Sequence, residues 1–78
     1  MLRTGDILIL REREYRRGEG AIMVRILAVG GLRRDDDGYW LPVKCAQTTW
    51  RVEPQVRFIE IRTCSIIRAR RRAAETSD

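Results

Sequence analysis

Two segments of this chain are apolar on both faces of an extended strand. One is the run Ile-Leu-Ile-Leu at 7–10, and the other is 22–29, where Ile22, Val24, Ile26 and Ala28 alternate with Met23, Arg25, Leu27 and Val29. A strand with one face in water normally alternates apolar and polar residues. Both segments therefore need cover on a second face, which we expect from the C-terminal segment or from a second subunit. In the second case the contact would involve Met23, Leu27 and Val29.

Two further strands follow. In 39–47, Tyr39, Leu41, Val43 and Cys45 share one face, and Pro42 belongs at an edge or a bulge because it cannot donate to a ladder. In 56–63, Val56 and Phe58 have one parity whereas Ile59 and Ile61 have the other. This change of phase predicts a β-bulge between Phe58 and Ile59, with Phe58 in the core.

The connections between these segments indicate a small antiparallel barrel. A charged first loop at 11–19 precedes a glycine-containing turn, and a polar connection at 31–38 has the composition of a hairpin loop. The fold class we expect is mainly β, with four to five strands. The order of loops resembles that of SH3-like barrels over about residues 5 to 68, an architecture that serves many functions.

The segment SIIRARRRAAE at 65–75 has two interpretations. It forms either a short fifth strand through Ile67 or a helix that is capped by Ser65 and runs to about Ala74. As a helix it would be amphipathic, with Arg68, Arg71 and Arg72 opposite Ile66, Ala69 and Ala73. We expect a barrel domain at 1–68 followed by a basic extension at 69–78.

Composition excludes several kinds of site. The 78 residues contain two cysteines and no histidine, which is too few ligands for a structural zinc site, so we expect no metal and no cofactor. The apolar run at 7–10 is too short for a signal peptide or a membrane span, which predicts a cytoplasmic chain. There both cysteines would be reduced and packed inside the fold.

Catalysis has little support. Histidine, the commonest general acid–base group, is absent, so neither cysteine has a base to activate it. Asp35, Asp36 and Asp37 form the one acidic cluster, but it lacks the ligand spacing of an EF-hand calcium loop. Loop solubility explains these aspartates better, and we expect no enzyme activity.

Charge is the feature that points to a partner. The net charge is +5, and 57–72 alone holds six arginines and one acid, so the rest of the chain is balanced. A concentrated basic segment is typical of proteins that bind phosphates, and DNA or RNA is the partner we expect. The candidate phosphate-binding residues are Arg57, Arg62, Arg68, Arg70, Arg71 and Arg72, with Arg16 and Arg17 as a second patch.

Aromatic rings beside cations can stack on bases. Tyr15 lies in the charged first loop, and Trp40 lies on the strand face opposite Leu41, so both are candidates for stacking. The alternative is that these rings cover the small core, which is common for aromatic residues.

These observations lead to two functional hypotheses from different classes. The first is a non-enzymatic nucleic-acid-binding module that uses arginine–phosphate contacts. The second is a protein-interaction or assembly module, either a homo-oligomer or an accessory subunit, that uses the apolar strand face. A membrane-surface role is excluded, because the apolar side of 65–75 lacks the Trp, Phe and Leu that insert among lipid headgroups.

Overall fold

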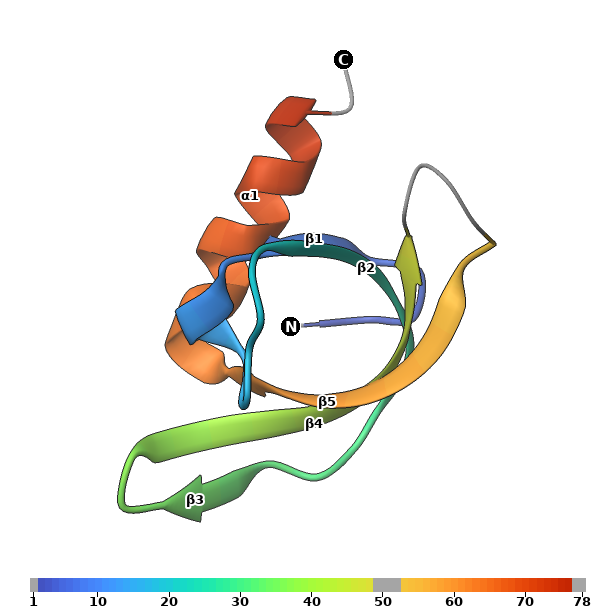
Figure 1. The fold of residues 1–78 in the computed structure, drawn as a ribbon. Helices are drawn as coiled ribbons and strands as arrows, with labels where there is room; N and C mark the ends of the chain where they lie inside the picture. The colour runs from blue at the N-terminus through green and yellow to red at the C-terminus, as the bar shows by residue number, and fades with distance from the viewer. Residues whose placement is uncertain (1, 49–52, 77–78) are drawn as a thin grey trace.

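A computed structural model describes residues 2–48 and 53–76. They form one curled antiparallel sheet of five strands and a C-terminal helix (Figure 1). This confirms the prediction of a mainly β chain. The sheet order is β1-β2-β4-β3, and β5 also pairs with β4. The strands are β1 (Ile7–Leu10), β2 (Ile22–Val29), β3 (Arg33–Asp35), β4 (Gly38–Thr48) and β5 (Gln55–Arg62).

The sheet curls into an incomplete ring. Tyr15, which follows β1, makes a single antiparallel bridge to Ile61 of β5, but no ladder joins β5 to β1 among the described strands. The expected closed barrel is therefore not confirmed. The first loop contains a short 3₁₀ helix, η1 (Glu12–Glu14), so β1 ends at Leu10, before the alternating charges that follow it.

The helix α1 (Ile66–Thr76) supplies cover for β1. Ile66, Ala69 and Ala73 are its buried residues, as the amphipathic pattern predicted. At the edge of the sheet, the Arg72 Nη1 group donates a hydrogen bond to the Ile9 carbonyl oxygen at 2.8 Å. The C-terminal segment thus covers β1, one of the two segments that the sequence predicted would need cover, and its Arg72 occupies a backbone acceptor of this edge strand.

The helix interpretation of 65–75 is confirmed, and the strand interpretation is wrong. A 3₁₀ turn, η2 (Thr63–Ser65), leads from β5 into α1, which ends two residues beyond the expected Ala74. Ser65 is buried, and its hydroxyl oxygen accepts a hydrogen bond from Arg68. Because α1 begins at Ile66, the expected boundary between 68 and 69 falls inside a single helix.

A register shift in β2 separates residues that the sequence placed together. Val24 and Ile26 are fully buried, but the pairing with β4 shifts between Ile26 and Ala28. After the shift Val29 pairs with the core residue Val43. Ala28 is therefore exposed and on the outer face, and the expectation that Val29 shares a face with Met23 is wrong, because one extra residue reverses the alternation.

The predicted bulge in the last strand is also wrong. β4 and β5 pair in one unbroken register from Trp40–Arg62 to Gln47–Gln55. Ile59 and Ile61 face the core, whereas Phe58 lies on the outer face and is 79% exposed, so its assignment to the core is wrong. Apolar residues occur at both the odd and the even positions of this strand, so the sequence pattern does not indicate which set faces the core.

Pro42 is not on an edge strand, although it does lie at an irregularity. It pairs with Glu60 of β5, and on its other side β4 changes partner. The pairing with β3 ends at Trp40, and the pairing with β2 begins at Val43. The residue without an amide hydrogen thus lies between two ladders.

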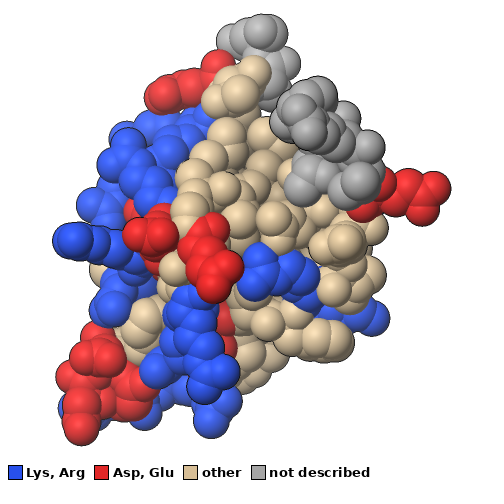
Figure 2. Space-filling model, in the orientation of Figure 1, with Lys and Arg blue, Asp and Glu red and all other residues tan. Residues whose placement is uncertain are grey.

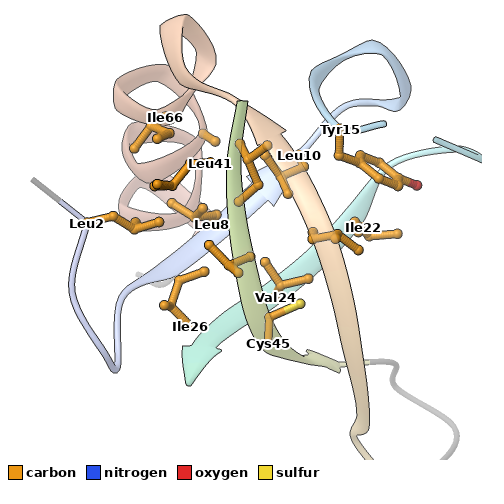
Figure 3. Packing of buried hydrophobic residues seen from close by; sticks show 14 residues of the cluster. Leu2, Leu8, Leu10, Tyr15, Ile22, Val24, Ile26, Leu41, Cys45 and Ile66 are labelled. Carbon is orange, nitrogen blue, oxygen red and sulfur yellow. The ribbon is translucent and has the colours of Figure 1, made fainter. Parts of the chain in front are cut away.

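The core lies inside the curl of the sheet, between the strands and α1 (Figure 3). Cys45 is fully buried there, as predicted, whereas Cys64 is exposed at η2, so its predicted burial is wrong. The core cluster consists of Leu2, Leu8, Leu10, Tyr15, Ile22, Val24, Ile26, Leu41, Val43, Cys45, Ile59, Ile61, Ile66 and Ala69. Within the described residues no helix has the length and apolar character needed to cross a membrane.

Candidate nucleic-acid interface

A concave basic surface lies between η1 and the start of α1. We call it the basic cleft. It has a volume of about 490 Å³ and is lined by Arg11, Glu12, Arg13, Glu14, Arg62, Ser65, Arg68 and Arg72. Five arginines there face two glutamates, so the cleft is positive. In the space-filling view, arginine and lysine side chains gather on the side of the molecule where α1 and η1 lie (Figure 2).

A buried ion pair forms the floor of the cleft. The Arg72 Nη1 and Nη2 groups donate to the two carboxylate oxygens of Glu14 at 2.5 and 2.8 Å, and the Arg11 backbone N–H donates to Glu14 at 2.8 Å. The hydrogen bond from Arg72 lowers the pKa of Glu14 to about 2. Because Arg72 is engaged with this acid, the positive charge open to a ligand belongs mainly to Arg11, Arg13 and Arg68, which are exposed.

The loop after η1 is held by Tyr15. Its hydroxyl donates to the Gly20 carbonyl oxygen at 2.8 Å and accepts from the Glu19 N–H at 3.0 Å. Gly18 is required nearby, because a Cβ atom there would lie 1.9 Å from the Glu12 carbonyl oxygen. Tyr15 is only 3% exposed, so the expectation of an exposed ring is wrong: the ring completes the core and its hydroxyl anchors the loop.

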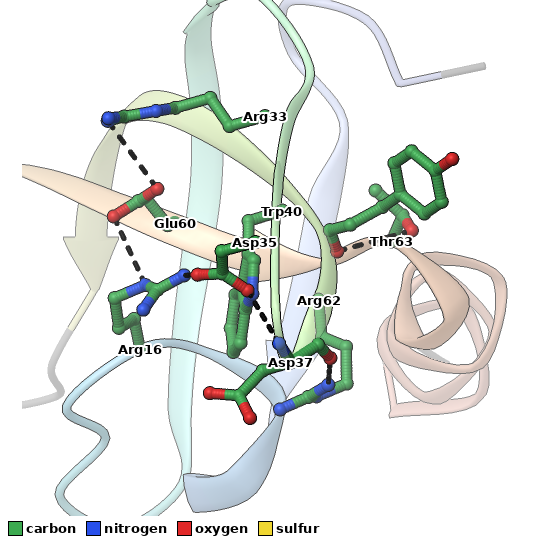
Figure 4. Close-up of polar contacts among 9 residues, drawn as sticks. Arg16, Arg33, Asp35, Asp37, Trp40, Glu60, Arg62 and Thr63 are labelled. Carbon is green, nitrogen blue, oxygen red and sulfur yellow. Dashed lines mark hydrogen bonds and ion pairs between the residues drawn. The ribbon is translucent and has the colours of Figure 1, made fainter.

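Trp40 lies on the outer face of β4, as predicted, but it is not open to solvent. The guanidinium carbons of Arg16 and Arg62 each lie 4.3 Å from the ring centroid, and Figure 4 shows the ring between them. The side chain is 4% exposed. A base has no access to this ring, and the stacking partners of Trp40 are the chain's own cations.

Acidic groups complete this arrangement, which we call the Trp40 network (Figure 4). Asp35 forms an ion pair with Arg16 and accepts a hydrogen bond from the Trp40 Nε1–H at 3.1 Å. Arg62 donates to the Asp37 carbonyl oxygen at 2.9 Å. The hydrogen bond between Arg16 and Asp35 lowers the pKa of the carboxyl group and raises that of the guanidinium. Asp35 therefore anchors the β3–β4 hairpin, a role beyond loop solubility.

The structure divides the arginines that the sequence grouped together. Three of the predicted phosphate-binding residues form ion pairs: Arg16, Arg72 and Arg70, which pairs with Asp6 at 3.1 Å. Arg62 is held by the Asp37 carbonyl oxygen and the Trp40 ring. Arg57 donates a hydrogen bond to the neutral Gln47 amide oxygen at 2.6 Å and forms no ion pair with any described residue. Arg17, Arg68 and Arg71 are exposed and form no ion pair within the described residues.

A second hollow surrounds Phe58 on the outer face of β5. We call it the Phe58 hollow. It has a volume of about 380 Å³ and is lined by Arg16, Arg17, Arg33, Arg57, Phe58, Ile59 and Glu60. Glu60 is held by Arg16 at 3.3 Å and by Arg33 at 3.7 Å. The sequence analysis missed Phe58 and Arg33 here, and Arg11 and Arg13 in the basic cleft. The alternating Arg-Glu-Arg-Glu run was the available signal, but it was assigned to a charged connecting loop.

The residues predicted for a protein contact are dispersed. Met23 lines an apolar hollow of about 390 Å³ with Ile7 of β1 and Ala73 of α1. Leu27 is half-buried, and its carbonyl oxygen accepts a hydrogen bond from Thr4. Val29 lies beyond the register shift. Of these three residues, Met23 lines a surface hollow of the described chain that a partner can enter.

The described part of the chain contains no group of three or more Cys, Asp or Glu side chains that could hold a metal ion. Comparison of the chain with protein-family models, curated proteins and solved structures finds no match.

Proposed function

We propose that this protein is a non-enzymatic nucleic-acid-binding module that contacts phosphates through the basic cleft. The observation that supports this most is the convergence of Arg11 and Arg13 from one element with Arg68 from another on a single concave surface. Arginine side chains recognise phosphate oxygens by charge and by paired N–H donors. A cleft that collects them from separate segments concentrates positive potential where a phosphate can enter.

The internal ion pairs support the same proposal. The pair of Arg72 with Glu14 removes one positive charge from the cleft but fixes its floor, since Glu14 also accepts the Arg11 N–H. The three exposed arginines then project from an ordered base. On the fold, we infer that the curled sheet is a form of the small SH3-like barrel in which the Tyr15–Ile61 bridge stands where a closing ladder would be.

The test is equilibrium binding of fluorescently labelled single-stranded RNA, single-stranded DNA and duplex DNA at low salt. Arg13→Gln/Arg68→Gln removes two cleft charges, and Arg3→Gln/Arg25→Gln removes two exposed charges elsewhere. We expect native binding that the cleft pair weakens at least tenfold and the control pair leaves within about twofold. Equal loss from both pairs, or no binding by the native chain, would exclude the basic cleft as the site.

A second function has one specific observation in its favour. The apolar hollow formed by Ile7, Met23 and Ala73 lies beside α1 on the strand face that the sequence predicted would need a partner. A second copy of this chain is the occupant to test first, because self-association enlarges a small core. Met23→Asp would convert a dimer into a folded monomer, as measured by light scattering and circular dichroism. A native chain that is monomeric at high concentration would contradict self-association.

A further inference from the structure

Phe58 is a large aromatic side chain held on a regular strand and directed away from the core. Its 79% exposed ring lies in the middle of β5, where the register with β4 is unbroken and Lys44 is the directly paired residue. Single exposed apolar residues are common on protein surfaces and need no explanation. What distinguishes Phe58 is its position in a hollow whose other walls are mostly arginine.

The cations around this ring keep charge available for a ligand. Arg57 is oriented by the neutral Gln47 side chain and so retains its full charge. Arg17 is exposed and forms no ion pair within the described residues, and its φ of 57° directs the chain sharply after Arg16. Arg33 is 3.7 Å from Glu60, which Arg16 also contacts. Glu60, the acid that lines the hollow, is therefore shared between Arg16 and Arg33.

We propose that the Phe58 hollow binds an unpaired base of a single-stranded nucleic acid. The base stacks on the Phe58 ring, and Arg17 and Arg33 hold the adjacent phosphates. Aromatic platforms flanked by cations are the general solution for single strands, whose bases are free to stack on a protein ring. The bases of a duplex are already stacked and paired, so a ring on the outer face of the sheet has no access to them.

The outer face of β5 connects the Phe58 hollow to the basic cleft. Phe58, Glu60 and Arg62 share the outer face of β5, and Arg62 lines the basic cleft. Four residues of a strand span about 13 Å. A single strand whose base stacks on Phe58 therefore continues past the Trp40 network into the cleft. This inference rests on the proposed function, because the cleft supplies most of the attraction and Phe58 selects the unpaired strand.

The experiment changes both binding partners. The Phe58 ring is substituted in the protein, and the bases are removed from the ligand. Native chain and Phe58→Ala are titrated with a single-stranded DNA of about eight nucleotides, with the same backbone lacking its bases, and with a duplex. Phe58→Trp retains a stacking surface, and Phe58→Leu retains only apolar character. Ile67→Ala, on an exposed helix residue, is the matched control.

We expect Phe58→Ala to weaken binding of the base-containing single strand by about five- to one-hundredfold, the range for loss of one stacked base. Phe58→Trp should bind like the native chain, whereas Phe58→Leu should resemble Phe58→Ala. Binding of the base-free backbone and of the duplex should be the same for native and Phe58→Ala. The melting temperature should not change, because the ring is outside the core.

Failure of this inference is distinct from failure of the proposed function. If the native chain binds and the Arg13/Arg68 pair weakens it, but Phe58→Ala has no effect on the single strand, the cleft stands and the stacking site is wrong. Equal weakening of the base-free backbone by Phe58→Ala also overturns the stacking site. If the native chain binds none of the three ligands, both proposals fail together.

Discussion

Glu14 shows how one residue connects stability with the candidate site. It is an acid in a basic chain, yet it is buried and accepts hydrogen bonds from both the Arg72 side chain and the Arg11 backbone. Removing one partner of a buried pair leaves the other charge unpaired, which is the costly case for such pairs. Glu14 therefore holds α1 against η1 as well as forming the floor of the basic cleft.

We predict that Glu14→Gln destabilises the chain by about 3 kcal/mol, from the lowering of the Glu14 pKa from 4.5 to about 2. Because the folded pKa is below the unfolded one, this contribution is complete well above pH 4.5. It is lost as the pH falls from 4.5 to 2. Urea unfolding across this range should show a difference between native and Glu14→Gln that disappears toward pH 2.

The matched control is Glu75→Gln, which removes an exposed carboxylate from α1, the helix that Glu14 contacts through Arg72. Its stability should stay within about 0.5 kcal/mol of the native value at every pH. A native-minus-variant difference for Glu14→Gln that is constant down to pH 2 would contradict the ion pair as the source of the effect.

The helix α1 packs on β1 and covers one side of the open sheet. An isolated helix of 11 residues is marginal in water, so its stability comes from the face that packs on β1. Ala69 is fully buried on that face, whereas Arg71, two residues later, is exposed. Small residues on the buried face let the helix approach the strand closely.

We predict that Ala69→Gln destabilises the chain by about 2 kcal/mol or more, because a longer polar side chain must enter a filled and apolar contact. Arg71→Gln introduces the same residue on the exposed side and should change stability by less than about 0.5 kcal/mol. Thermal unfolding measured by circular dichroism compares the two variants. Similar melting temperatures would show that α1 is not docked through Ala69.

β1, β2, β4 and β5 could be located from the sequence because each has a strong local pattern, whereas β3 lies in the segment that was predicted to be a polar connection and the helix was one of two interpretations of 65–75. Alternation locates β4, and the helical spacing of Ile66, Ala69 and Ala73 locates the buried face of α1. The features that failed depend on tertiary pairing. The register shift in β2 and the outward direction of Phe58 are set by which strand lies opposite, and no local pattern contains that information.

At the scale of the whole molecule, the net charge was evident from the sequence but its distribution was not. Arg16 and Arg62 were predicted to bind phosphates, and the fold places them on the two sides of Trp40. Arg11 and Arg13 were assigned to a charged connecting loop, and the fold places them beside Arg68. Ion pairs between segments that are distant in the sequence decide which arginines remain available to a ligand. The order of residues along the chain does not predict these pairs.

Phosphate binding in the basic cleft is tested by the salt dependence of binding. Each phosphate contact with a single strand contributes about 0.7 to the slope of log K against log salt. We predict that Arg13→Gln/Arg68→Gln lowers this slope by about 1.4, while Arg3→Gln/Arg25→Gln leaves it unchanged. A slope that falls equally in both pairs would mean that binding follows net charge alone, and would contradict a site in the cleft.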